Sequence, residues 1–253
     1  MEFGANFGQK VDLTARIREI LRNYPEGSAM LKEFVQNADD AGATSFSVTL
    51  DEREVGPRCV TAAFRGPALV CSNDAVFAER DFLSIQRVGD SLKRRDPSVG
   101  AAAEEDSGVK TGRFGIGWNA AYHVTETPSF ASASKVVFFD PQAKYLPGLD
   151  PSNPGKMVDL RTDRHVIDEF PDQFAGYGFD RAATYYGATT FRLPLRTEDQ
   201  ARTSRLSTRA RTVEDVRDHL LADFADQARG MLVFLKSVEK ITVTHWPRGA
   251  DRP

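Results

Sequence analysis

The sequence has few of the residues from which disulfide frameworks, protein-bound metal centres and membrane spans are built. Only two of its 253 residues are cysteines, Cys59 and Cys71, and both lie in strand-like stretches. So few cysteines argue against a disulfide-rich secreted scaffold, and their spacing is not that of a zinc site. No apolar run approaches the roughly 20 residues of a membrane-spanning helix, and no apolar signal-peptide core opens the chain. We therefore expect a soluble, cytoplasmic protein without a membrane partner.

The sequence also lacks an excess of charge of either sign. Its 33 basic and 36 acidic residues give a formal net charge of −3. A nucleic-acid-binding domain normally carries a basic surface, so we expect no nucleic-acid partner. Hydrophobic residues make up 41% of the chain and charged residues 27%, as in a globular protein. The length suits one large domain or two small ones.

The stretch from Leu31 to Gly42 is typical of an amphipathic helix with an unusual polar stripe. Its apolar face carries Leu31, Phe34, Val35 and Ala38. Its polar stripe consists of Glu33, Asn37 and Asp40, at positions i, i+4 and i+7. This stripe has two acids and an amide but no lysine, whereas a solvated face usually mixes both signs. The helix alone leaves a solvated face and a ligand-facing one equally open.

The two ends of this helix carry residues that favour helix boundaries. Ser28 is a candidate N-cap, because its hydroxyl can accept a hydrogen bond from a free backbone N–H. Gly42 suits the left-handed position just past the C-terminus. We therefore expect the helix to begin after Ser28 and to end before Gly42.

Two further motifs are typical of nucleotide sites. A turn with glycines at 112, 115 and 117 leads into a helical segment that ends near Thr125. Glycines let the backbone approach a ligand closely, and a helix N-terminus presents unpaired N–H groups to phosphate. Between the helix of residues 31–42, here called the organising helix, and this turn, the sequence Ser72-Asn73-Asp74-Ala75-Val76-Phe77 follows an apolar run.

The remaining chain alternates between helical and strand-like patterns. We expect helices at 13–21, 78–87, 116–125 and 212–229, with Asp12 and Thr212 as N-caps of the first and last. We expect strands at 44–50, 58–64, 68–72, 189–195, 231–235 and 238–244, and two more between 129 and 140. A helix followed by an antiparallel meander is the order of an α+β domain.

Two segments are typical of loops with possible functions. Gly89 to Lys110 is long, charged and poor in apolar residues, which is typical of a functional lid or of disorder. Residues 196–211 and the preceding strand hold six arginines and no lysine. We favour a solvated, mobile connector at 196–211 over a binding patch.

The motifs, in this order, resemble the Bergerat-type ATP site shared by heat-shock chaperones, DNA gyrase, histidine kinases and mismatch-repair ATPases. The match is closer still to the nucleotide-binding repeats of sacsin. The matching motifs include Gln36-Asn37-Ala38-Asp39-Asp40-Ala41, Phe114-Gly115-Ile116-Gly117, Tyr122-His123-Val124-Thr125, Phe139-Asp140-Pro141-Gln142 and Phe191-Arg192-Leu193-Pro194-Leu195-Arg196. Several ordered motifs are far more specific than a lone glycine turn.

The resemblance implies an α+β fold, a two-layer α/β sandwich with helices on one face of a mixed, mainly antiparallel sheet. It implies one ATP-binding domain over residues 1–246, with a lid at 89–111 and a tail at 247–253. A segment within the lid, 98–108, is an insertion relative to close relatives, which puts lid closure in question.

The resemblance also implies a role for each residue of the site. Glu33 corresponds to the general base that polarises the attacking water, and Asn37 to the ligand of Mg²⁺. Asp40 would face the ligand or its water shell. Asp74 corresponds to the carboxylate that accepts a hydrogen bond from the adenine amino group, which favours adenine over guanine. Thr189 would support that contact, with Thr190 as the neighbouring candidate.

The glycine turn would bind the phosphates. Its residues are Gly112, Arg113, Phe114, Gly115, Ile116 and Gly117, of which Phe114 is better suited to packing than to chemistry. Lys93 and Arg113 would meet phosphate charge on lid closure, although solvated side chains fit the pattern equally well. His123, on the segment after the turn, is expected to be packed and hydrogen-bonded rather than catalytic.

The function implied by the resemblance is an ATP-binding, slowly hydrolysing module of a sacsin-like chaperone, with ATP and Mg²⁺ as cofactors and client proteins and co-chaperones as partners. Related chaperones supply a catalytic arginine or lysine from a following domain, so turnover would be slow here. The alternative is a nucleotide-binding scaffold that recruits partners without hydrolysis. A histidine-kinase-like transferase lacks an upstream helix with a phosphoacceptor histidine, and a gyrase-like role rests on fold alone.

Overall fold

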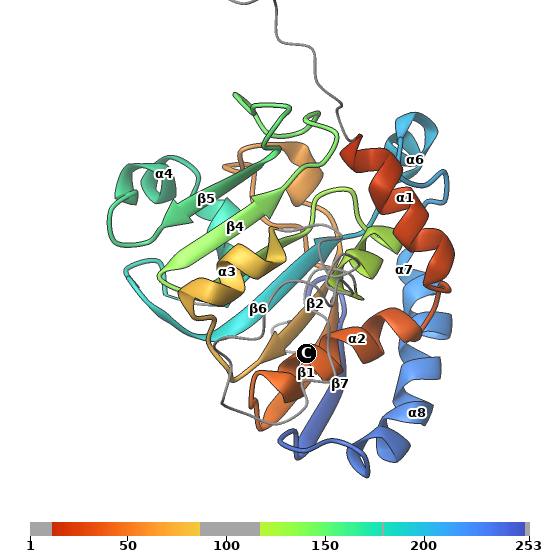
Figure 1. The fold of residues 1–253 in the computed structure, drawn as a ribbon. Coiled ribbons are helices and arrows are strands. Elements are labelled where there is room, and N and C mark those ends of the chain that lie inside the picture. The colour runs from red at the N-terminus through yellow and green to blue at the C-terminus, as the bar shows by residue number, and fades with distance from the viewer. Residues whose placement is uncertain (1–11, 87–116, 179, 251–253) are drawn as a thin grey trace, which may run out of the picture.

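A seven-stranded sheet forms the frame of the domain (Figure 1). The computed structural model describes residues 12–86, 117–178 and 180–250. The strands are β1 (Ser45–Asp51), β2 (Ala68–Asn73), β3 (Ser129–Ala133), β4 (Lys135–Phe139), β5 (Gly155–Asp159), β6 (Tyr186–Pro194) and β7 (Lys240–Trp246), in the order β5-β4-β3-β6-β2-β1-β7. Only β1 and β7 pair in parallel, and the other neighbours are antiparallel. The expected mixed, mainly antiparallel sheet is confirmed.

The helices are distributed unequally over the two faces of this sheet. They are α1 (Leu13–Asn23), α2 (Ala29–Asp40), α3 (Glu79–Ile85), α4 (Arg164–Glu169), α5 (Pro171–Ala175), α6 (Glu198–Thr203), α7 (Val213–Asp215) and α8 (Ala222–Leu232), with 3₁₀ turns η1 (Ala62–Phe64) and η3 (Gly117–His123) and the π-helical turn η4 (Val216–Leu221). Figure 1 shows α2 lying across the sheet near β1 and β2, with α1 and α8 beside it. The main layer of helices therefore covers one face.

Alternation along the strands divides the buried side chains into two cores. Phe130, Val137 and Phe191 join the larger core beneath α1, α2, η4 and α8. Their neighbours Ala131 and Phe138 point the other way, into a smaller core that α4, α5 and η1 close. The α+β sandwich is thus confirmed, with a small additional layer over β3, β4 and β5.

Helix α2 begins and ends where its sequence predicts, but its N-cap residue makes no capping hydrogen bond. Gly42 has a φ of 77°, in the left-handed region expected of a residue that ends a helix. Ser28 has helical backbone angles and makes no side-chain cap hydrogen bond. Its Oγ instead lies 3.1 Å from Nε2 of Gln227, so Ser28 joins α2 to α8. Ser28 therefore occupies the expected N-cap position, and only its expected capping hydrogen bond is absent.

Two predicted strands and one predicted helix take other forms. Residues 58–64 form a loop and η1, in which Thr61 accepts from the N–H of Ala63. Residues 231–235 form the end of α8 and the turn after it. Met231, Leu232 and Leu235 pack on the core at helical spacing, while Phe234 is 86% exposed. The segment predicted as a helix at 116–125 contains the 3₁₀ turn η3, which is buried on all sides.

Asp39, in the middle of the organising motif, ties α2 to the start of β7. It is buried, and its Oδ1 accepts from the backbone N–H of Lys236, Ser237 and Val238 at 2.9, 2.7 and 3.0 Å. Burial by itself raises the pKa of this carboxyl, but these N–H groups outweigh it and hold the pKa below its ordinary value. Asp39 is therefore a structural residue that orients α2 relative to the sheet.

We expect Asp39→Asn to lose stability at neutral pH and to lose little at low pH. Removing the charge weakens hydrogen bonds to a charged acceptor, which costs about 1.5–3 kcal/mol. Because the folded pKa is lowered, the contribution is present above the unfolded pKa and is lost as the pH falls through the folded value. Urea unfolding of both proteins at several pH values measures the difference. A difference that stays constant between pH 7 and strongly acidic pH would contradict this role.

The six arginines at and after β6 make contacts within the domain. Arg192 donates to the carbonyl oxygens of Phe64 and Gly66, and Arg196 is fully buried. The others form ion pairs: Arg202 with Asp199, Arg205 with Asp12, and Arg209 and Arg211 with Glu26 and Asp215. The expectation of a solvated segment is thus wrong for Arg196, while the mobility of 196–211 stays a prediction.

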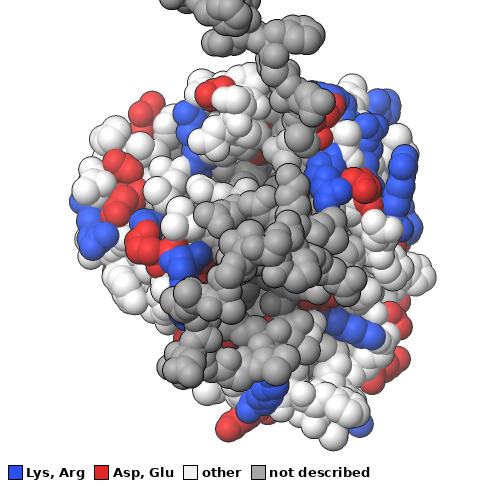
Figure 2. All heavy atoms as spheres, in the orientation of Figure 1, with Lys and Arg blue, Asp and Glu red and all other residues white. Residues whose placement is uncertain are grey.

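The surface seen in Figure 2 carries Lys and Arg side chains interleaved with Asp and Glu. Within the ranges that the structure describes, no helix combines the length and the apolar character needed to cross a membrane.

Candidate functional site

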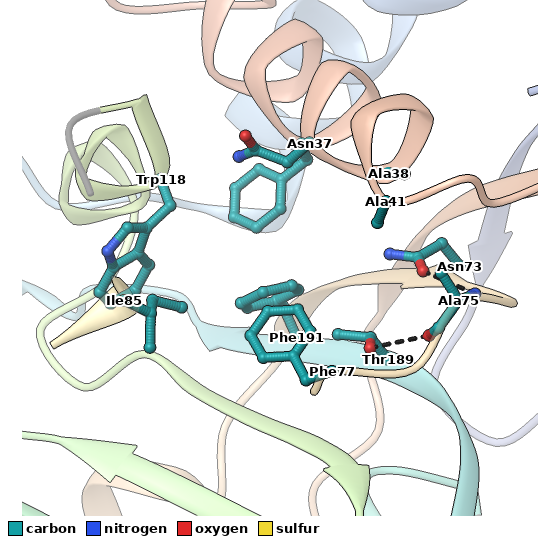
Figure 3. A pocket seen from close by; sticks show the side chains of 11 residues that line it. Asn37, Ala38, Ala41, Asn73, Ala75, Phe77, Ile85, Trp118, Thr189 and Phe191 are labelled. Carbon is teal, nitrogen blue, oxygen red and sulfur yellow. Dashed lines mark hydrogen bonds between the residues drawn. The ribbon is translucent and has the colours of Figure 1, made fainter. Parts of the chain in front are cut away.

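A cavity lies between α2, the turn after β2 and strand β6 (Figure 3). Its lining is mainly apolar and aromatic, and three polar side chains interrupt it: Asn37, Asn73 and Thr189. The full set of lining residues is Phe34, Asn37, Ala38, Ala41, Asn73, Ala75, Phe77, Ile85, Trp118, Thr189 and Phe191. This mixture of apolar and polar lining is the kind found in small-molecule sites, while the cavity volume of about 20 Å³ is that of about one water molecule.

Packed aromatic rings build the base of the cavity. Phe191 lies edge-on to Phe34, with ring centroids 5.0 Å apart, so α2 is held against β6. Phe77 joins the same cluster, 5.1 Å from Phe130 and 6.2 Å from Phe191. Edge-to-face rings at these separations pack favourably and give the cavity a rigid wall.

Thr189 lies on the cavity side of β6 within a buried hydrogen-bond network. Its Oγ1 donates to the carbonyl oxygen of Ala75 at 2.9 Å and lies 2.8 Å from Oγ of Ser132. The same Ser132 hydroxyl accepts from the N–H of Phe77 at 2.9 Å. These bonds fasten the turn after β2 to the sheet, so the shape of the cavity depends on Thr189.

Strand alternation separates Thr189 from the other candidate, Thr190. Thr190 points to the opposite face, where its Oγ1 lies 2.7 Å from Oγ of Ser72 and 2.8 Å from the hydroxyl of Tyr186. Thr190 does not line the cavity and Thr189 does. Of the two positions that the sequence left open, the structure brings Thr189 to the site.

Asn73, rather than Asp74, faces the cavity. The carboxylate of Asp74 accepts from the backbone N–H groups of Thr44 and Ser45 at 2.8 and 3.1 Å, and from the hydroxyl of Thr44. Burial alone raises the pKa of this carboxyl, but these bonds outweigh it and lower the pKa to about 2. Asp74 is exposed and fixes the start of β1. Of the two neighbours, Asn73 lines the cavity and Asp74 does not, and the role that the resemblance implied for Asp74 stays a prediction.

The side chain of Asn73 is oriented by its own turn. Its Oδ1 accepts from the N–H of Ala75 at 3.0 Å, and Figure 3 shows its nitrogen on the side of Ala41 and the cavity. Asn73 pairs with Thr189 across the β2–β6 register. The two polar side chains therefore come from adjacent positions of neighbouring strands.

Glu33 lies against Gly117, the last glycine of the glycine turn. A Cβ atom built on Gly117 would lie 2.8 Å from Cδ of Glu33 and closer still to its Oε2. A side chain at position 117 would displace the Glu33 carboxylate from this position. Partial burial raises the pKa of Glu33 above its ordinary value. A carboxylate with a raised pKa is better matched to accept a proton near neutral pH.

The other predicted site residues divide into three groups. Asn37 lines the cavity from α2, with its amide directed toward Trp118 in Figure 3. Asp40 lies on the same helix, half-exposed, and does not line the cavity. The remaining predicted positions are outside the described residues: Lys93, Gly112, Arg113, Phe114, Gly115, Ile116 and the lid at 89–111.

Sequence reasoning missed Asn73 although a signal for it was present. Leu69 and Cys71 on β2 belong to the core beneath α2. Successive side chains of a strand alternate between faces, so Asn73 continues the same face while Asp74 lies past the end of the strand. Counting along the strand would have favoured Asn73 over the more reactive carboxylate next to it.

The chain was compared with known proteins. A family model described as Sacsin domain matches residues 10–253. The chain is 37% identical over 250 residues to sacsin of Homo sapiens, an alignment that covers 95% of this chain. The same alignment covers 5% of the human protein, so the chain spans a small part of that relative. By both comparisons, the chain belongs to the Sacsin domain family.

Proposed function

We propose that this domain binds ATP together with Mg²⁺ and hydrolyses it slowly. The observation that carries the proposal is the convergence of Asn37, Asn73 and Thr189 on one aromatic cavity, with Glu33 held nearby against Gly117. The apolar side chains suit the faces of a purine base, and the polar groups suit the edge of that base and a hydrated cation, which would enter as the cavity widens.

Each end of the site has a distinct task in this proposal. Phe34, Phe77 and Phe191 form a wall against which a flat base can pack. Asn37 offers an amide oxygen to Mg²⁺, a hard cation that takes few protein ligands and keeps several waters. When bound, the cation neutralises phosphate charge. Thr189 holds the turn of Ala75 and thereby the position of Asn73.

Glu33 is the residue that we assign to hydrolysis. Its burial disfavours the charged form, so the carboxylate gains more from accepting a proton from water than an exposed glutamate does. Because Gly117 has no side chain, the carboxylate of Glu33 can occupy the space beside its Cα atom. A positioned general base of this kind contributes about 10²- to 10⁴-fold to a rate.

Membership of the Sacsin domain family supports a place for this ATPase in a longer chaperone-type protein of the cytosol. Its partners would be client proteins and co-chaperones, whose binding the nucleotide state would regulate. A scaffold that binds ATP without hydrolysis is the competing function, and it uses the same cavity without Glu33. The two differ in turnover and not in binding.

Calorimetric titration of ATP with and without Mg²⁺ tests the site through Asn37. We expect Asn37→Ala to weaken Mg²⁺-dependent binding by about 1.5–3 kcal/mol, on the order of tenfold to a hundredfold, because a charge-bearing contact is lost. Gln36→Ala is the matched control, since Gln36 lies next to Asn37 on α2 and does not line the cavity. Equal effects of the two substitutions would contradict the proposed cation contact.

A further inference from the structure

Asn73 places an amide, rather than a carboxylate, at the polar edge of the cavity, and this changes which bases the cavity accepts. A carboxylate can only accept hydrogen bonds, whereas an amide has both donors and an acceptor. We propose, on the basis of the ATP site proposed above, that Asn73 lets the cavity bind purine nucleotides with either a 6-amino or a 6-oxo group.

The local hydrogen bonds fix the direction of this amide. Oδ1 of Asn73 accepts from the N–H of Ala75 at 3.0 Å, which leaves its NH₂ group on the cavity side. Thr189 in turn holds Ala75 by its carbonyl oxygen at 2.9 Å. The turn is also tied to β3, because Ser132 accepts from the N–H of Phe77. The NH₂ donor of Asn73 therefore faces the cavity from a rigid support.

An amide in this orientation satisfies both kinds of purine edge. With a 6-aminopurine, the NH₂ group donates to ring N1. With a 6-oxopurine, the same NH₂ group donates to O6. Each base thus makes one hydrogen bond with the amide in its fixed orientation, whereas a carboxylate at this position has no proton to donate to either acceptor.

No other described polar side chain lining the cavity supplies a selective contact. Asn37 is on α2, on the Trp118 side in Figure 3, and is used by the cation in the proposal. The hydroxyl of Thr189 already donates to Ala75. The nearest acid in the sequence, Asp74, is committed to Thr44 and Ser45. Base selection at this edge thus depends on Asn73.

The test is calorimetric titration of Mg²⁺–ATP and Mg²⁺–ITP into the full 253-residue chain. ITP carries the 6-oxo group without the extra amine of guanine, so it isolates the hydrogen-bonding question. We expect wild-type affinities for ATP and ITP within about tenfold of each other, since both bases accept the same neutral hydrogen bond from the NH₂ group of Asn73. This comparison needs no variant and so does not depend on the folding of a mutant.

Asn73→Asp converts the site into one that prefers ATP. The new carboxylate keeps the acceptor for the N–H of Ala75 but faces O6 of ITP with a second acceptor and no proton between them. We expect ITP to bind on the order of tenfold to a hundredfold more weakly relative to ATP than in the wild type. Asp74→Asn is the matched control and leaves the ratio unchanged.

The outcomes separate this inference from the proposed function. Binding of ATP with wild-type ITP affinity lower by about a hundredfold or more overturns the inference and leaves the ATP site intact. A ratio that changes in Asp74→Asn but not in Asn73→Asp also overturns it, by assigning base selection to Asp74. Binding of neither nucleotide overturns the proposed function and the inference together.

Discussion

Glu33→Gln is expected to lower the single-turnover rate of ATP hydrolysis by about 10²- to 10⁴-fold while ATP binding is retained. Glutamine keeps the shape and polarity of the side chain but cannot take a proton. The carboxylate lies against Gly117, and its burial raises its pKa. A loss confined to turnover is the signature of a general base, because an interaction with the ground state would alter binding as well.

The pH dependence of hydrolysis gives a second measure of the same residue. A general base must be deprotonated, so the wild-type rate falls as the pH drops through the raised pKa of Glu33. The residual rate of Glu33→Gln lacks this decline. Glu239→Gln, a substitution of an exposed glutamate just before β7, is the control and leaves both the rate and its pH profile unchanged. A wild-type rate in Glu33→Gln would remove Glu33 from the chemistry and favour the scaffold function or another base.

Arg196→Ala is expected to destabilise the domain more than any other substitution discussed above, by about 3–5 kcal/mol. Arg196 is fully buried, and its guanidinium forms an ion pair with the buried carboxylate of Glu126. It also donates to the carbonyl oxygens of Tyr122, His123, Thr125 and Arg209. Alanine leaves a buried carboxylate without its cation and four carbonyl groups without this donor.

Denaturant unfolding monitored by circular dichroism measures this effect. Arg202→Ala is the matched control, because Arg202 is 69% exposed and pairs with an exposed aspartate on the same helix. A surface pair of this kind contributes about 0–1 kcal/mol. Arg196→Lys is expected to remain strongly destabilised, because one ammonium group cannot replace a planar guanidinium group whose N–H donors point in several directions. A loss in Arg196→Ala no larger than in Arg202→Ala would contradict the structural role of the buried pair.

The buried contacts of Arg196 also support the turn η3, which borders the candidate site. Arg196 donates to backbone groups at the end of η3, whose first residue, Gly117, touches Glu33. His123, in the same turn, is buried with Nε2 2.8 Å from the carbonyl oxygen of Tyr24, which confirms its packed role. The turn that carries Gly117 is therefore held in place by buried polar contacts.

Periodicity predicted the parts of the fold that depend on local pattern. Helix α2, strands β1 and β2, and the caps at Asp12 and Thr212 all follow from residues close in sequence. The position of Ser28 as N-cap was predicted correctly, but the partner of its hydroxyl was not, because the hydroxyl bonds to Gln227, about two hundred residues away. The buried state of Arg196 likewise depends on Glu126 and on backbone groups that no local pattern identifies.

At the site, the sequence predicted the elements better than the exact residues. Glu33, Asn37 and Thr189 come from motifs whose spacing places them on known faces of a helix or strand, and the structure puts them in or beside one cavity. Asp74 was assigned through the family resemblance, whereas the strand register directs Asn73 to the cavity side. A motif match does not distinguish two neighbouring residues as strand geometry does.

Titration of ATP into the wild-type chain, with and without Mg²⁺, is the measurement that tests the central claim most directly. The cavity between α2, the Asn73 turn and β6 predicts saturable, Mg²⁺-dependent binding of one nucleotide per chain. Absence of saturation up to about 1 mM ATP, or less than about 4 kcal/mol of binding free energy, would contradict it. The cavity would then have to serve the packing of α2 against the sheet and not a nucleotide.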